Sequence, residues 1–259
     1  MRSKDLIELA RTSDFISGIY NYCDRWCERC PLTSRCLLYA SEREDEGLDG
    51  KGCELNNASF WQTLEAVLQD TQSLIDCWVR QARIDLQEVA KDAGARREKR
   101  GAKAHRDGLA IAAKEYAAAV DEWCRSWDET LRIYDGSPGE NELEESERIK
   151  EAREIIHWYQ YQIAVKIVRA LWSRADELEW QDDSDSGNDS DGLMKVALIG
   201  VDRSMSAWRL MQITLPEQSE SIVPLILLLE RLRHKIEKRF PKARGFIRPG
   251  FDELLGEAN

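Results

Sequence analysis

Four of the seven cysteines of the chain lie within one short segment, CDRWCERCPLTSRC. They are Cys23, Cys27, Cys30 and Cys36, and their spacing is Cys-x3-Cys-x2-Cys-x5-Cys. Thiolates bind zinc and the irons of iron–sulfur clusters, and four of them complete the ligand set of either centre. Four cysteines in fourteen residues are difficult to explain as small hydrophobic core residues. The segment is therefore predicted to bind an inorganic centre.

The spacing also predicts how the chain brings the four sulfurs together. Cys23, Cys27 and Cys30 are separated by four and three residues, so on a helix they would share one face. Pro31 follows Cys30 directly and disfavours helical geometry in the residue before it. We therefore expect a helix that ends near Cys30 and a turn that returns Cys36 as the fourth ligand.

The sequence leaves the centre open between a [4Fe–4S] cluster and Zn²⁺. Structural zinc sites more often use two pairs of ligands that are separated by a longer insert, whereas here all four cysteines lie in one wrap. The last three cysteines, in CERCPLTSRC, resemble the iron–sulfur loop of the endonuclease III-type DNA glycosylases. The resemblance covers about fourteen residues, and it departs at the front, where this chain leaves three residues before the second cysteine. It implies a [4Fe–4S] cluster at these cysteines and does not imply DNA repair.

A second candidate metal site lies in the middle of the chain. Glu154 and His157 form a Glu-x-x-His pair beside the apolar stretch IIHWYQYQIAVKIVRALW. In di-iron carboxylate bundles such a pair supplies two ligands and faces a second pair of the same spacing. The nearest second pair, Glu230 and His234, is spaced by four residues rather than three. The alternative is a core histidine that is held by a hydrogen bond or an ion pair.

The elements that must position these residues are helical. Strand patterns are almost absent, and apolar residues recur at helical spacing in five long segments, about 57–94, 109–134, 140–172, 193–213 and 221–240. The fourth segment carries small residues near one face, namely Ala197, Gly200, Ser204 and Ala207, which permit close approach to a neighbouring helix. The predicted fold class is all-α, a bundle of about five long helices with a small N-terminal cysteine-rich helical appendage.

The composition divides the chain into two predicted parts. Residues 1–52 form the cysteine-rich metal-binding helical segment, which the stretch EREDEGLDGKG closes, and residues 53–259 form the helical bundle. Residues 176–192 contain eight acids and no lysine or arginine, which is typical of an acidic linker.

The net charge and the hydropathy of the chain limit which partners and which cellular location are expected. A net charge of −11 disfavours general nucleic-acid binding. The N-terminal stretch has no apolar core of a signal peptide, and the longest apolar run, 222–229, is far shorter than the roughly 20 residues that span a bilayer. We expect a cytoplasmic protein without a membrane segment, in which thiols stay reduced.

Three functions follow from these observations. The first is a soluble metal-binding helical protein whose four-cysteine centre is structural or relays electrons to a protein or redox partner. The second is a di-metal carboxylate oxidoreductase with its site inside the bundle, at Glu154 and His157. The third is a non-catalytic helical adaptor that zinc pins in place. The sequence does not decide whether the protein is an enzyme, and it leaves the oligomeric state open.

Overall fold

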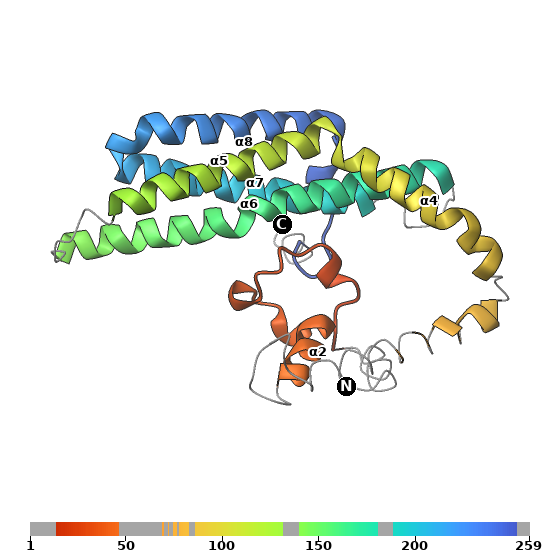
Figure 1. Ribbon diagram of the computed structural model, residues 1–259. Coiled ribbons are helices and arrows are strands. Elements are labelled where there is room, and N and C mark those ends of the chain that lie inside the picture. The colour runs from red at the N-terminus through yellow and green to blue at the C-terminus, as the bar shows by residue number, and fades with distance from the viewer. Residues whose placement is uncertain are drawn as a thin grey trace. The chain divides into compact units, whose positions relative to one another are not determined.

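The protein is described by a computed structural model that covers residues 14–46, 69, 72, 75–76, 78–82, 86–131, 140–180 and 189–252. In these ranges the regular secondary structure is entirely helical, which confirms the all-α prediction (Figure 1). Five helices have 20 or more residues. Within the same ranges, no helix is both long and apolar enough to cross a membrane.

The α-helices with described bounds are α2 (Leu37–Glu46), α4 (Leu86–His105), α5 (Gly108–Leu131), α6 (Glu140–Trp180), α7 (Asp189–Thr214) and α8 (Ser219–Arg239). Short 3₁₀ turns connect them or flank them: η1 (Ile19–Asn21), η2 (Cys27–Arg29), η3 (Thr33–Arg35), η4 (Pro216–Gln218) and η5 (Ala243–Gly245). The expected start of the first long helix near residue 57 lies outside the described residues. That helix was expected to fade near Gly94, but α4 continues through this glycine to His105.

The chain divides into two compact units. One unit comprises Met1–Arg97 together with Arg248–Asn259, and the other comprises Glu98–Ile247. The predicted boundary at residue 52 lies outside the described residues, and it stays a prediction. The end of the chain belongs with the cysteine-rich segment and not with the bundle, because the backbone of Gly250 lies against Ile16 and Ile19.

The second unit is built around α5, α6, α7 and α8, which lie side by side as a four-helix bundle (Figure 1). The apolar residues that recur at helical spacing within residues 109–134 form a seam along α5, and this seam is buried at Leu109, Ala113, Tyr116, Val120, Trp123 and Trp127. Trp123 stacks on Trp127 with ring centroids 5.4 Å apart, and it meets Trp208 of α7 edge-on at 4.9 Å. Aromatic rings from α5 and α7 therefore form part of the bundle core.

Helices α6 and α7 approach each other closely at Gly200. A Cβ atom at this position would lie 3.0 Å from Tyr159 Cδ1 and 3.1 Å from Ile163 Cγ1 of α6. The other small residues of this face, Ala197, Ser204 and Ala207, are also buried. The predicted close approach along this face is confirmed.

Both described ends of the acidic stretch 176–192 are helical, although the stretch was predicted to be a linker. Helix α6 extends to Trp180, α7 begins at Asp189, and only residues 181–188 lie outside the described residues. The physical reason is helix capping. The Glu177 carboxylate accepts hydrogen bonds from the backbone N–H and the hydroxyl of Ser190, both at 2.8 Å. Carboxylates at this end of α7 also favour its positive dipole end.

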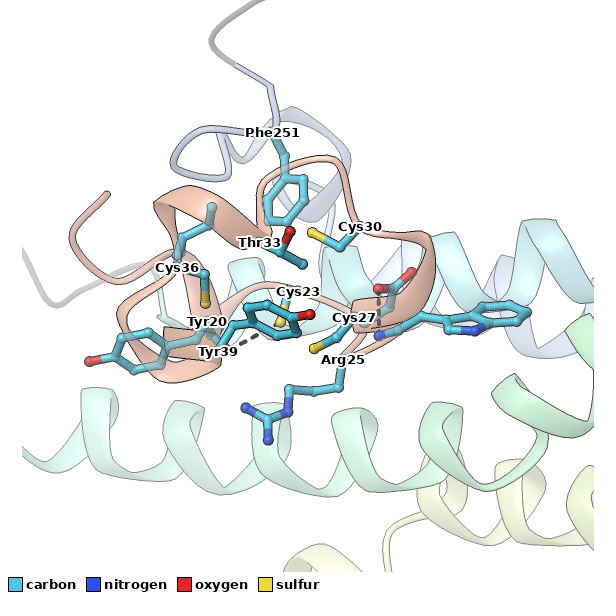
Figure 2. A pocket seen from close by; sticks show the side chains of 12 residues that line it. Tyr20, Cys23, Arg25, Cys27, Cys30, Thr33, Cys36, Tyr39 and Phe251 are labelled. Carbon is cyan, nitrogen blue, oxygen red and sulfur yellow. Dashed lines mark hydrogen bonds between the residues drawn. The ribbon is translucent and has the colours of Figure 1, made fainter. Parts of the chain in front are cut away.

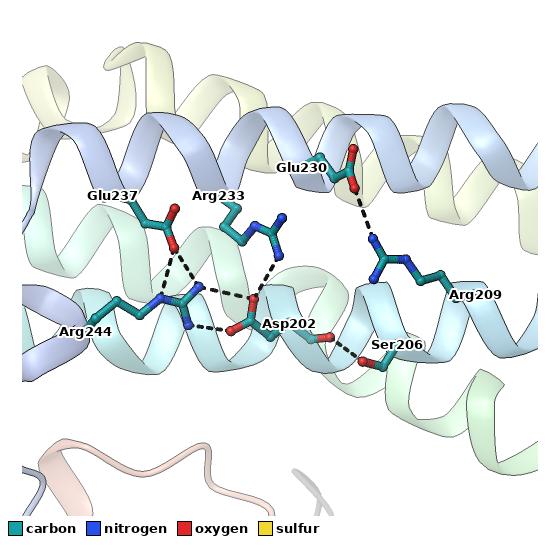
Figure 3. Close-up of polar contacts among 7 residues, drawn as sticks. All are labelled: Asp202, Ser206, Arg209, Glu230, Arg233, Glu237 and Arg244. Atoms are coloured by element: carbon teal, nitrogen blue, oxygen red, sulfur yellow. Dashed lines mark hydrogen bonds and ion pairs between the residues drawn. The ribbon is translucent and has the colours of Figure 1, made fainter.

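A ladder of ion pairs fixes the turn that follows α8 (Figure 3). Arg244 of η5 binds the carboxylate of Asp202 on α7, and it binds Glu237 of α8 at 2.8 Å. Arg209 and Glu230 add a further contact between α7 and α8 at 3.1 Å. Because these pairs are partly exposed, each contributes only about 0.2–1 kcal/mol, but together they define where the chain leaves the bundle.

Candidate metal centre

Cys23, Cys27, Cys30 and Cys36 line a single pocket in the first unit (Figure 2). The rest of its lining is formed by Ile19, Tyr20, Asp24, Arg25, Trp26, Thr33, Tyr39 and Phe251. The four cysteines are half-buried, and none of them forms a disulfide bond. The empty volume is about 320 Å³ when the part that is open to solvent is included. The structure therefore brings together all four thiols that the sequence spacing singled out.

The local backbone that does this is not the predicted α-helix. Cys23 lies in a bend, and Cys27 begins the 3₁₀ turn η2. The N–H of Cys30 donates to the carbonyl of Cys27 at 3.2 Å, and Cys30 itself is extended, with φ −86° and ψ 122°. The helical turn thus ends before Pro31, as predicted. Residues i and i+3 lie above one another in a 3₁₀ turn, so Cys27 and Cys30 share a face without an α-helix.

The same construction is repeated six residues later along the chain. The N–H of Cys36 donates to the carbonyl of Thr33 at 3.2 Å, which closes η3. Cys36 is extended like Cys30, with φ −107° and ψ 110°, and α2 begins at the next residue. Two 3₁₀ turns that each end in an extended cysteine therefore wrap the chain around the pocket.

Backbone groups also point at two of the sulfurs. The N–H of Leu32 lies 3.4 Å from Cys30 Sγ and donates to it. The thiol of Cys23 donates to the carbonyl of Tyr20 at 3.5 Å. An N–H that donates to sulfur stabilises the thiolate form that binds a metal, and such hydrogen bonds also orient metal ligands.

Arg25 supplies positive charge to the wall of the pocket. It has a positive φ of 58°, which is uncommon for a residue other than glycine. Its guanidinium group pairs with Glu42 of α2 at 2.8 Å. Burial raises the pKa of the Cys27 thiol, and the charge of Arg25 acts in the opposite direction. A cation at this place offsets part of the negative charge that four thiolates would carry.

The donor set fits an inorganic centre by its chemistry, since four thiols from one wrap face one space. Within the described residues, however, no three His, Cys, Asp or Glu side chains form a group that could hold a single metal ion. The sulfurs surround the pocket, as Figure 2 shows, and do not meet at one point.

Glu154 and His157 lie elsewhere. Both side chains are exposed on α6, so the prediction that they lie inside the bundle is wrong. The buried face of α6 is formed instead by Ile156, Tyr159, Gln160, Ile163 and Ile167, which follow the 3.6-residue period of the helix. The second pair is not interior either, because His234 is exposed and Glu230 pairs with Arg209.

Of the twelve residues that line the pocket, the sequence had singled out only the four cysteines, and two of the others bear on its chemistry. Phe251 comes from the other end of the chain, and the only signal for it was the aromatic content of the C-terminal stretch. Arg25 lies between two of the cysteines, but a single arginine in a charged segment carries no signal of its own.

Comparisons with known proteins identify no relatives. No family model matches the chain, and no curated protein and no solved structure shows significant similarity to it. The resemblance of residues 27–36 to the glycosylase loop therefore stays a prediction.

Proposed function

We propose that this chain is a metal-binding helical protein whose cysteine pocket holds a [4Fe–4S] cluster, with a structural or electron-relay role. One observation carries the proposal: Cys23, Cys27, Cys30 and Cys36 all line one pocket. They reach it from a bend and from two successive 3₁₀ turns. A chain that only buried four small hydrophobic residues would not need to place all four around one pocket.

The spacing of the cysteines supports a cluster over a single zinc ion. Structural zinc sites more often use two pairs of ligands that are separated by a longer insert, whereas all four cysteines of this chain lie within one wrap of fourteen residues. The last three of them also resemble the iron–sulfur loop of the endonuclease III-type DNA glycosylases. When bound, such a cluster supplies one-electron transfer or a rigid cross-link between its four ligands.

The chain's own residues prepare the pocket for a negatively charged centre. Arg25 contributes a cation, and the N–H of Leu32 donates to the sulfur of Cys30. Trp26 is 6% exposed, and the guanidinium of Arg29 stacks over its ring at 4.2 Å. Positive charge, an N–H donor and apolar walls are the features by which a protein tunes an iron–sulfur centre.

Metal analysis of protein purified without oxygen tests the proposal. We expect about four irons and four sulfides per chain, a broad visible absorption band and little zinc. A colourless protein with one zinc per chain would contradict the cluster and favour the zinc-pinned adaptor. Protein that binds neither metal after reconstitution would contradict the site itself.

A matched pair of cysteine variants locates the centre. Cys30→Ser removes a ligand that also accepts the Leu32 N–H, so we expect loss of the metal while the far-ultraviolet circular dichroism stays helical. Cys124→Ser changes a half-buried cysteine of α5 that does not line the pocket, and it should keep the full metal content. Equal metal content in both variants would contradict the four-ligand assignment.

A further inference from the structure

The last described residues of the chain form a stapled turn. In this C-terminal turn, Arg248–Asp252, the Arg248 guanidinium donates to both carboxylate oxygens of Asp252, at 3.0 and 3.1 Å. The backbone N–H of Arg248 donates to the same carboxylate at 2.9 Å. The two side chains are only 16% and 11% exposed, so solvent screens this pair less than a surface ion pair. The turn is therefore held in shape by its own contacts.

Glycine at position 250 lets this turn reach the N-terminal loop. Gly250 has a φ of +74°, and a Cβ atom there would lie 2.6 Å from Ile16 Cδ1 and 3.3 Å from Ile19 Cδ1. Any other residue would be strained at this positive φ, and its Cβ atom would force the Ile16 side chain to shift. Ile19 is 2% exposed and itself lines the cysteine pocket. The docking surface of the turn is thus the segment that directly precedes the cysteines.

The turn places one aromatic ring on the pocket. Phe251 lines the pocket together with the four cysteines, and Figure 2 shows its ring on the side of Thr33 and Cys30. The Arg248 guanidinium stacks over the ring at 4.8 Å from its centroid. The ring is therefore held on one side by Arg248, and Phe251 is half-buried.

We propose that the C-terminal turn is the cover of the cysteine pocket, and that Phe251 limits the access of water and small solutes to the centre. The apolar shell around a metal site controls solvent access to it, and this shell is completed by a residue more than 200 positions away in the chain. The role in protecting a metal rests on the proposed function. The role in shielding the thiols does not, because Phe251 lines the same pocket as the four cysteines whether or not a metal is bound there.

Two measurements test the cover on the full-length protein. In the metal-free protein, iodoacetamide labelling of each cysteine is followed by mass spectrometry, with Cys124 as the internal reference. In the metal-loaded protein, transfer of the metal to a chelator is followed by absorbance. Phe251→Ala should raise both rates several-fold, whereas Phe251→Leu, which keeps an apolar side chain, should raise them less. Ile247→Ala is the matched control, because this neighbouring side chain is 60% exposed and does not line the pocket.

Asp252→Asn provides a second test of the cover if Phe251→Ala fails to fold. Asp252→Asn weakens the staple without changing any residue of the pocket lining, so it should also speed labelling of the four cysteines but not of Cys124. Unchanged labelling in both variants overturns the cover. If the wild-type protein takes up no metal but labelling still accelerates in the variants, the cover stands and the proposed function fails.

Discussion

Trp208 of α7 donates its indole N–H to the hydroxyl of Tyr116 on α5 across 3.0 Å, and both side chains are completely buried. The pair links two helices in the centre of the bundle, beside the ring contact between Trp123 and Trp208. Each partner satisfies a polar group that would otherwise be buried without a hydrogen bond. The contact therefore contributes to stability, and the burial of the Tyr116 hydroxyl makes that stability depend on pH.

Replacing Tyr116 by phenylalanine should destabilise the bundle. Tyr116→Phe leaves the Trp208 N–H buried without its acceptor, and this costs about 1–3 kcal/mol of unfolding free energy. Urea unfolding at neutral pH, followed by tryptophan fluorescence, measures it. Tyr161→Phe is the control, since Tyr161 is 54% exposed and its hydroxyl, which binds Asp121, stays accessible to water. A loss in the control as large as in Tyr116→Phe would contradict the assignment to the buried pair.

The same tyrosine predicts a loss of stability at alkaline pH. Burial raises the pKa of Tyr116 to about 12, although its hydrogen bond with Trp208 acts in the opposite direction. The pKa of Tyr116 is higher in the folded protein than its value of about 10 in the unfolded chain. The stability that Tyr116 contributes is therefore complete below pH 10, and it is lost as the pH rises through 12. The shift corresponds to a loss on the order of 2–3 kcal/mol. Tyr116→Phe should lack this component, so the stability difference between the two proteins should narrow across that window. A stability difference between the wild-type protein and Tyr116→Phe that stays constant from pH 10 to pH 12 would contradict the raised pKa of Tyr116.

Gly200 and Gly101 should respond to alanine with opposite signs. At Gly200 the added methyl group meets Tyr159 and Ile163, which are both buried, so we expect a net loss of about 1 kcal/mol or more. At Gly101, within α4, nothing lies within 4 Å of the added atom. There the higher helix propensity of alanine should stabilise by about 0.5–1 kcal/mol. Thermal and urea unfolding measure both variants, and a stabilising Gly200→Ala would contradict the close approach of α6 and α7.

The apolar periodicity of the sequence was sufficient to predict which residues of α5 lie in the interior of the bundle. The seam of α5 is buried where the spacing placed it, because a helix that packs on one face must repeat its apolar residues every three or four positions. The same periodicity did not predict which face of α6 is buried. Tyr161 and Val165 have largely apolar side chains, yet they are 54% and 55% exposed. A stretch that is apolar on every side does not reveal which side faces the core, and this is why Glu154 and His157 were placed inside.

The sequence was sufficient to predict which cysteines line the pocket, but not which backbone conformation positions them. Spacing alone grouped the four thiols, and Pro31 marked the end of the turn before it. The spacing of four and three fits an α-helix as well as the observed bend at Cys23 followed by the 3₁₀ turn at Cys27, so the sequence could not decide between these backbones. Phe251 was out of reach, because its place depends on a contact between the two ends of the chain, and no local pattern encodes such a contact.

Arg25 and Glu42 should tune the proposed cluster in opposite directions. Reduction adds negative charge, so a cation in the wall of the pocket favours the reduced form and an anion beside it disfavours that form. Arg25→Gln should therefore lower the reduction potential, and Glu42→Gln should raise it, each by tens of millivolts. Because the two side chains are 43% and 46% exposed, both shifts should shrink in high salt. Arg25→Lys is the matched control, since it keeps the charge and should retain most of the wild-type potential. Protein-film voltammetry measures all four proteins, and shifts of the same sign in Arg25→Gln and Glu42→Gln would contradict an electrostatic role for this pair.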